Sequence, residues 1–126
     1  MRRAALAVTV VLAFAGTAAA GMIVTVGPSA NGKIVHLRVG ETLAVALPGN
    51  AGTGYHWVVS ASNANVLEAG AIIYASSKKN VPGAPGTYTL RFRGVAVGKA
   101  ALKLSYVPPG RNGKAVKTFA CTVLVA

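Results

Sequence analysis

Residues 87–106 read TYTLRFRGVAVGKAALKLSY, and both ends of this stretch alternate between apolar and polar side chains. The alternation runs through Thr87–Arg93 and again through Lys99–Tyr106. A period of two is typical of a β-strand that buries one face and exposes the other. The stretch therefore predicts two strands, whose core-facing side chains are Tyr88, Leu90, Phe92, Leu102, Leu104 and Tyr106.

The same period recurs on both sides of this stretch, between clusters of Gly, Pro, Asn and Ser. No long segment has its apolar residues at helical spacing. Near the C-terminus, Lys117 has the same parity as Phe119, so the last strand is expected to bulge or to leave the core there. The further predicted strands are Met22–Val26, Lys33–Val39, Thr42–Leu47, Tyr55–Ser60, Ala71–Ser77 and Thr118–Val125.

This strand pattern predicts an all-β protein, an immunoglobulin-like sandwich of about seven or eight antiparallel strands. Asn31-Gly32 lies between the first two predicted strands, and this dipeptide favours a tight hairpin. We therefore expect Met22–Val26 to pair with Lys33–Val39. Because the sequence has no internal repeat and no linker, residues 21–126 are expected to form a single domain.

Residues 1–20 have the pattern of a signal peptide that is removed on export. Met1-Arg2-Arg3 is positively charged, residues 4–16 are mostly apolar, and Ala18-Ala19-Ala20 is a small-residue cleavage signal. The apolar run is too short for a membrane-spanning helix, so no integral membrane segment is expected. The protein is predicted to be exported, to the periplasm or to the extracellular space.

The chain is strongly basic. Thirteen Lys and Arg residues oppose two acidic residues, which gives a net charge of +11, reduced to +9 when Arg2 and Arg3 are removed with the leader. This charge favours contact with acidic surfaces. The aromatic residues, however, mostly have core-facing parity, whereas nucleic-acid bases need exposed stacking partners. We therefore expect no nucleic-acid partner.

Few residues are available for catalysis. The carboxylates of Glu41 and Glu68 both lie beside glycines in turns, and two such groups cannot supply a glycosidase pair or a calcium cage. Cys121 has no partner for an intramolecular disulfide, and its apolar strand predicts a buried, unreactive thiol. The protein is therefore not expected to be an enzyme, and no cofactor is expected.

A metal site is the weakest functional alternative. His36 and His56 both have outward parity on their strands, and a site that uses both, with Met22, would bind copper or zinc. Metal ligands usually cluster with polar partners that orient them. Surface histidines are the simpler interpretation, so no resident metal is expected.

Three connections are rich in glycine and proline: residues 48–54, Lys78–Gly86 and residues 107–113. In a sandwich whose strands run up and down, alternate connections fall at the same end. The three loops are therefore expected to form one contiguous surface. Asn50 and Thr53 each have a side chain able to close the first loop by bonding to its own backbone.

These loops resemble those of the chagasin family, which inhibits papain-like cysteine peptidases. The family's first loop, Asn-Pro-Thr-Thr-Gly, is followed by an aromatic residue and a tryptophan; here residues 50–54 read NAGTG before Tyr55 and Trp57. The second, Gly-x-Gly-Gly, is similar to GAPG at residues 83–86. The third, Arg-Pro-Trp, matches residues 107–109 only at Pro108, because its arginine and tryptophan are replaced.

The resemblance implies a reversible, non-covalent inhibitor, which is a monomer when free. Its first loop would lie over the catalytic cysteine of a papain-like peptidase, and the other two would straddle the walls of the cleft. Inhibition is expected to be weaker or differently targeted than in the family, with Arg111 or Tyr55 compensating for the lost tryptophan. The implied peptidase-binding residues are Asn50, Ala51, Gly52, Thr53, Gly54, Gly83, Ala84, Pro85, Gly86, Val107, Pro108 and Pro109.

The main alternative is a non-inhibitory module on the same fold, since fold alone does not determine function. Such a module would act in adhesion or in binding to the cell envelope, through its positive charge. The cations assigned to that role are Arg91, Arg93, Lys99 and Lys103.

Overall fold

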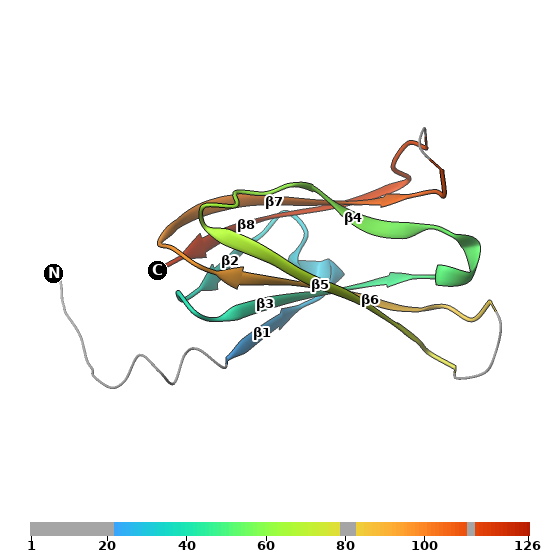
Figure 1. The fold of residues 1–126 in the computed structure, drawn as a ribbon, viewed down its shortest axis with the longest axis horizontal. Coiled ribbons are helices and arrows are strands. Elements are labelled where there is room, and N and C mark those ends of the chain that lie inside the picture. The colour runs from blue at the N-terminus through green and yellow to red at the C-terminus, as the bar shows by residue number, and fades with distance from the viewer. Residues whose placement is uncertain (1–21, 79–82, 111–112) are drawn as a thin grey trace, which may run out of the picture.

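The computed structural model describes residues 22–78, 83–110 and 113–126, and in them the chain forms two sheets packed face to face (Figure 1). The expected leader at residues 1–20 lies outside the described residues. The strands are β1 (Ile23–Val26), β2 (Ile34–Leu37), β3 (Thr42–Gly49), β4 (His56–Ala61), β5 (Leu67–Ser76), β6 (Gly86–Gly94), β7 (Gly98–Val107) and β8 (Lys117–Val125). Two short 3₁₀ turns, η2 (Pro28–Ala30) and η3 (Ala51–Thr53), join β1 to β2 and β3 to β4. No helix in these residues is long and apolar enough to span a membrane.

Each sheet has four strands, in the orders β1-β3-β6-β5 and β2-β8-β7-β4. The predicted immunoglobulin-like sandwich is confirmed. The expectation that every strand is antiparallel was wrong, because β1 pairs parallel to β3 and β2 pairs parallel to β8. The pairings β3–β6, β5–β6, β4–β7 and β7–β8 are antiparallel, as expected.

The core lies between the sheets and consists of the side chains that alternate inward along the strands. The six core-facing residues predicted in residues 87–106 are all buried. Burial of such side chains contributes about 1.5–3 kcal/mol each to folding. The largest fully buried side chains are Phe92, Leu43, Leu47, Leu67, Leu90, Leu102, Leu104, Val45 and Val123.

The hairpin predicted at Asn31-Gly32 does not form, because β1 and β2 belong to different sheets. The turn at Pro28–Ala30 carries the chain from one sheet to the other. Asn31 then accepts a hydrogen bond from the Ala120 amide at 2.8 Å, and the Gly32 amide donates to the Ala120 carbonyl at 2.7 Å. The dipeptide thus aligns β2 with β8 instead of pairing it with β1.

Two strand boundaries differ from the predictions. β5 begins at Leu67, four residues before the predicted start, and its pairing with β6 shifts register between Ala69 and Ile72. That irregularity interrupts the period of two and hides the first part of the strand in the sequence. At the start of β8, Lys117 is exposed and stays in regular register opposite Tyr106, so the strand leaves the core without a bulge.

The connections β3–β4, β5–β6 and β7–β8 lie at the same end of the sandwich, at the right in Figure 1. We call this the loop end; the opposite end, which carries the turns at residues 38–41, 62–66 and 95–97, is the far end. The β3–β4 loop lies between the other two in this view. Residues 79–82 of the second loop and 111–112 of the third, including Arg111, lie outside the described residues.

Candidate functional site

The first loop is a closed turn at residues 50–54. The Asn50 side chain accepts a hydrogen bond from the Gly52 amide at 3.0 Å and so caps the 3₁₀ turn. The Thr53 hydroxyl donates to the Asn50 carbonyl at 2.7 Å. Both side chains close their own turn, as the sequence predicts. This bonding holds Ala51, Gly52 and Thr53 in an exposed, defined conformation.

Asn50 also joins the first loop to the second. Its Nδ2 donates a hydrogen bond to the Gly83 carbonyl at 2.8 Å. A Cβ atom placed on Gly52 would lie 3.4 Å from the Gly83 Cα, so the two backbones are in close contact. The sequence gives no sign of this connection, because the two partners are 33 residues apart.

The first loop contacts the third loop on its other side. Gly54 ends the turn in the left-handed conformation, with φ of 83°, which favours glycine. A Cβ atom on Gly54 would lie 3.1 Å from both Cβ and Cγ of Pro109. The ring of Pro109 therefore occupies the space that a larger residue at position 54 would need.

Hydrogen bonds from β5 and from the residue that follows it fix the second loop. The Ser77 amide and hydroxyl both donate to the Pro85 carbonyl, at 2.9 and 2.7 Å. The Tyr74 hydroxyl donates to the Ala84 carbonyl at 3.3 Å. Because Gly86 lies against the ring of Tyr74 and the carbonyl of Ala75, no Cβ fits there.

A layer of aromatic side chains supports the first loop. The Asn50 amide donates to the Tyr106 hydroxyl at 3.0 Å, and the Tyr88 hydroxyl donates to the Tyr55 carbonyl at 3.0 Å. The rings of Tyr55 and Trp57 lie 5.7 and 5.1 Å from that of Tyr106. Tyr55 is half-buried and packs on the core, as its inward parity predicts.

The environment of Tyr88 keeps its hydroxyl neutral. Burial, and then the nearby hydroxyls of Tyr106 and Tyr74, raise the pKa of Tyr88 above its ordinary value of 10.0. The neutral phenol therefore remains a donor to the Tyr55 carbonyl throughout the physiological pH range.

The predicted site residues share one surface but differ in exposure. Asn50, Ala84, Gly86, Val107 and Pro108 are half-buried. The side chain of Pro108 packs where a Cβ on Gly113 would be, within the third loop. The solvent-exposed members are Ala51, Gly52, Thr53, Gly54, Gly83, Pro85 and Pro109.

The four cations assigned to adhesion do not form one patch. Arg91 and Arg93 are exposed on β6, whereas Lys99 and Lys103 are exposed on β7 in the other sheet. Exposed side chains of the two sheets point to opposite faces of a sandwich. The surface that the adhesive alternative requires is therefore divided between two faces.

The histidines of the metal alternative are also separated. His36 is on β2 and His56 on β4, the two edges of one sheet. His36 is opposite Leu124 near the far end, whereas His56 is opposite Val107 at the loop end. Within residues 22–78, 83–110 and 113–126, no three His, Cys, Asp or Glu side chains come together as metal ligands would.

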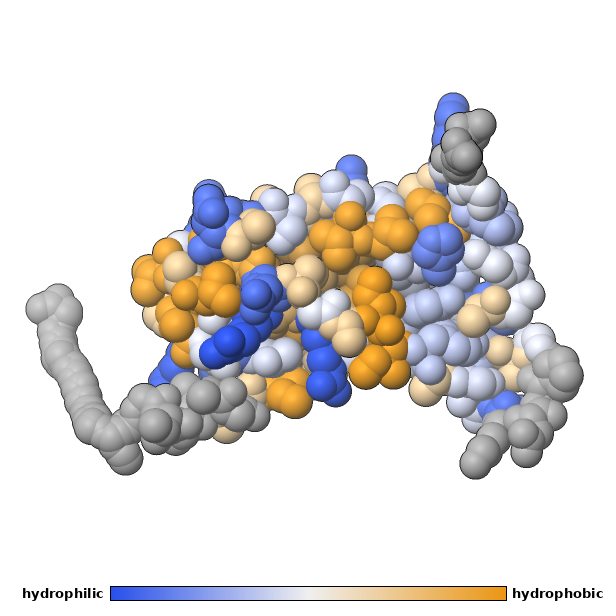
Figure 2. Space-filling model, in the orientation of Figure 1, coloured by the Kyte–Doolittle hydropathy of each residue, from blue (hydrophilic) through white to orange (hydrophobic). Residues whose placement is uncertain are grey.

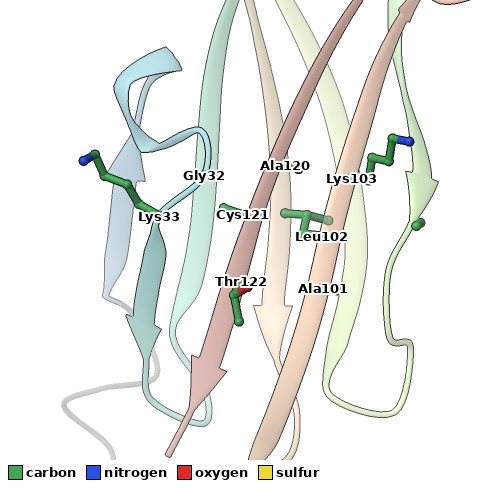
Figure 3. Close-up of a pocket in the computed structure, with 9 residues that line it drawn as sticks. Gly32, Lys33, Ala101, Leu102, Lys103, Ala120, Cys121 and Thr122 are labelled. Atoms are coloured by element: carbon green, nitrogen blue, oxygen red, sulfur yellow. The ribbon is translucent and has the colours of Figure 1, made fainter.

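A shallow hollow of about 340 Å³ lies over β7 and β8, lined by Lys33, Ala101, Lys103, Ala120 and Thr122 among others (Figure 3). The side chains of Lys33 and Lys103 point away from each other in this view. Cys121 also lines the hollow but is buried, and burial raises the pKa of its thiol above the ordinary value of 9.0. A neutral thiol is a poor nucleophile, so Cys121 does not supply a reactive thiolate to this hollow.

The fold is similar to that of several solved structures, one of which is described as a cysteine protease inhibitor. The structure is similar to the cysteine protease inhibitor EhICP2 from Entamoeba histolytica, with a TM-score of 0.72, 18% identity, and coverage of 83% of this chain and 96% of that chain. Amebosin gives a TM-score of 0.66 at 25% identity, covering 84% of this chain and 99% of that chain. PbICP-C, solved in complex with falcipain-2, gives 0.57 at 23% identity, covering 84% and 100%.

Comparison with sequence models of protein families identifies the family of the chain. No curated protein sequence is significantly similar to the chain. The sequence model of the chagasin family of peptidase inhibitors, however, matches residues 36–123. This match runs from within β2 to within β8 and includes all three loops. The chain therefore belongs to the chagasin family of peptidase inhibitors.

Proposed function

We propose that this protein inhibits papain-like cysteine peptidases reversibly and non-covalently, by inserting its loop end into the active-site cleft. The observation that carries the proposal is the direct connection of the three loops: Asn50 bonds to Gly83, and Gly54 packs on Pro109. Family membership supports the activity, and one structural relative, PbICP-C, was solved in complex with falcipain-2.

In the proposed complex the first loop lies over the catalytic cysteine, because it is central and exposed. The second loop, at Gly83–Gly86, and the third, at residues 107–109, straddle the cleft walls. The internal hydrogen bonds of the loops reduce the conformational entropy lost on binding. Glycines 52 and 54 allow the backbone to approach the enzyme closely, where peptide groups form hydrogen bonds.

The third loop differs from the family pattern at the position where the family has an aromatic residue. Buried aromatic residues are frequent anchors of protein interfaces, and here Pro109 stands where the family has tryptophan. We expect weaker or differently targeted inhibition as a result. Pro109→Trp should lower the inhibition constant for a papain-like enzyme by about tenfold, equivalent to about 1.4 kcal/mol. An unchanged inhibition constant would show that position 109 does not anchor the complex.

The proposal includes export and action as a monomeric, non-enzymatic protein. Removal of residues 1–20 would leave a mature chain that begins at Gly21 and acts in the periplasm or outside the cell. The mass of the protein recovered from the periplasm or the medium tests this: cleavage after Ala20 is expected, and recovery of the chain with Met1 retained would contradict it. Light scattering gives the mass of the mature protein in solution and so tests whether it is a monomer.

Inhibition kinetics test the main proposal. A papain-like peptidase is titrated with residues 21–126, and hydrolysis of an uncharged fluorogenic peptide is followed. We expect a saturable loss of activity that dilution restores, as non-covalent binding requires. If the folded protein causes no inhibition at micromolar concentration, the proposal is wrong.

A matched pair of variants ties the inhibition to the loop end. Ala51 and Ala64 are both exposed and lie in turns at opposite ends of the sandwich. Ala51→Gln should weaken inhibition by about tenfold or more, because it places a long side chain at the centre of the first loop. Ala64→Gln should leave the inhibition constant unchanged, and equal effects of the two substitutions would count against the loop end as the binding surface.

A further inference from the structure

We propose that the loop end selects peptidases whose cleft rim is acidic, because its positive charge speeds association with such a cleft. This inference rests on the proposed function and names the class of target. It predicts which papain-like enzymes the protein inhibits fastest.

The charges of the molecule are distributed unequally between its ends. Lys78, Lys114 and Lys117 are exposed at the loop end, in or beside the second and third loops. Both acidic residues of the chain, Glu41 and Glu68, lie at the far end. The loop end therefore presents cations with no carboxylate side chain nearby to neutralise them.

The two carboxylates also lie beside arginine residues of the far end. Glu41 accepts a hydrogen bond from the backbone amide of Arg38 at 2.7 Å. Glu68 lies opposite Arg93 in the pairing of β5 with β6. The carboxylates therefore offset part of the positive charge of the far end, whereas no carboxylate side chain offsets the lysines of the loop end.

The loop end lacks a large apolar anchor in the part of the chain that the structure describes. Figure 2 shows hydrophobic side chains gathered over the middle and the far end, whereas the loop end is pale to hydrophilic. Of the described large apolar side chains that are exposed, Val116 is the one at the loop end. The others are Met22, Ile23, Ile34, Val39, Val59, Ile72, Ile73, Val95 and Val97.

Charge at this position would act chiefly on the rate of association. A cluster of like charge attracts an oppositely charged cleft over about a Debye length, about 8 Å at physiological salt, and raises association rates by about 10- to 1000-fold. Charges at the rim of an interface change the association rate more than the dissociation rate. Lys117 has a further role, because its ammonium lies 5.8 Å above the ring of Tyr106 and helps to cover it.

Stopped-flow inhibition kinetics on two double variants of equal charge test the proposal. Lys78→Gln/Lys114→Gln removes two charges from the loop end, and Lys99→Gln/Lys103→Gln removes two from β7, away from the loops. Lys117 is left in place because of its contact with Tyr106. Thermal unfolding of each variant checks that the fold is retained.

With a peptidase whose cleft rim is rich in Asp and Glu, the loop-end variant should associate about three- to tenfold more slowly. Its dissociation rate should stay within about twofold of the wild-type value. The β7 variant should associate at the wild-type rate. Raising the salt concentration should lower the association rate of the wild-type protein more than that of the loop-end variant. A peptidase whose rim acids are neutralised should be inhibited more slowly, and its association rate should depend less on salt.

Two results overturn the inference and are distinguishable. If the protein inhibits but the two double variants behave alike, the proposed function stands and charge selection is wrong. If no papain-like peptidase is inhibited at any salt concentration, the proposed function fails and the inference fails with it.

Discussion

Asn50 and Gly83, 33 residues apart in the sequence, are joined by a hydrogen bond of 2.8 Å from the Asn50 Nδ2 to the Gly83 carbonyl. The same side chain accepts a bond from the Gly52 amide at 3.0 Å. One amide group therefore closes the first loop with its oxygen and holds the second loop with its nitrogen. This double use explains why asparagine, rather than aspartate or serine, suits the position.

The substitution Asn50→Asp tests that connection. Aspartate keeps the oxygen that accepts from Gly52 but places a second acceptor against the Gly83 carbonyl. We expect the inhibition constant to rise about tenfold, the value of one net hydrogen bond of about 1.4 kcal/mol. Dissociation rates measured by surface plasmon resonance should account for most of the change.

Asn63 provides the matched control for this prediction. Its side chain makes the same two kinds of bond at the far end, accepting from the Asn65 amide at 3.1 Å and donating to the Lys99 carbonyl at 3.2 Å. Asn63→Asp should lower stability by a similar amount and leave inhibition unchanged. If both variants weaken inhibition equally, the effect comes from general destabilisation and not from the loops.

Gly54→Ala should separate the first loop from the third. The methyl group would meet Pro109 at 3.1 Å, and alanine in the left-handed conformation costs about 1–2 kcal/mol. Gly32→Ala is the control, because Gly32 has a similar φ of 78° but no atom within 4 Å of the added Cβ. Both variants should unfold at lower denaturant concentration, and Gly54→Ala alone should lose inhibition. Loss of inhibition in both would contradict the role of the Gly54–Pro109 contact.

Tyr88→Phe should lower the free energy of unfolding by about 1–3 kcal/mol, because the Tyr55 carbonyl loses its buried donor. The pH dependence provides a second test. Since the folded-state pKa of Tyr88 is raised above 10.0, its contribution to stability is complete below about pH 10 and falls as the pH rises past that value. Denaturant titrations between pH 8 and pH 11 should show a shallower alkaline loss in Tyr88→Phe than in the wild type. If the free energy of unfolding falls equally steeply with pH in both proteins, ionisation of Tyr88 is not coupled to unfolding.

Cys121 should react with a thiol reagent only when the protein unfolds. The side chain is buried, 6% exposed, and its raised pKa keeps the thiol neutral at pH 7. The labelling rate in increasing urea should follow the unfolded population measured by fluorescence. Immediate labelling of the native protein would show that the thiol is accessible.

Local sequence pattern predicted the central part of the fold. β6 and β7 alternate regularly, and such alternation specifies both the strand and its buried face. The pattern failed where non-local contacts decide the structure: Asn31-Gly32 would suit a hairpin, but its bonds to Ala120 align β2 with β8. The register shift between Ala69 and Ile72 similarly hid the start of β5.

The candidate site was predictable in its location but not in its connections. Glycine and proline marked the three loops, and the sandwich order placed them at one end. The bond from Asn50 to Gly83 and the packing of Gly54 on Pro109 depend on how far each loop extends in space. No local sequence pattern indicates how far a loop extends, so these contacts could not be predicted from the sequence.

The central claim is that the loop end enters the active-site cleft. The most direct test compares binding to two forms of one papain-like peptidase. In one form the cleft is open, and in the other the catalytic cysteine carries a covalent peptide-like inhibitor. Calorimetry of both titrations with residues 21–126 gives the answer in one experiment. The account predicts saturable one-to-one binding to the open enzyme and none to the filled one, because the first loop and the covalent inhibitor would occupy the same space. Equal binding to both forms would show that the loop end does not enter the cleft, and absence of binding to either would contradict the inhibitor function.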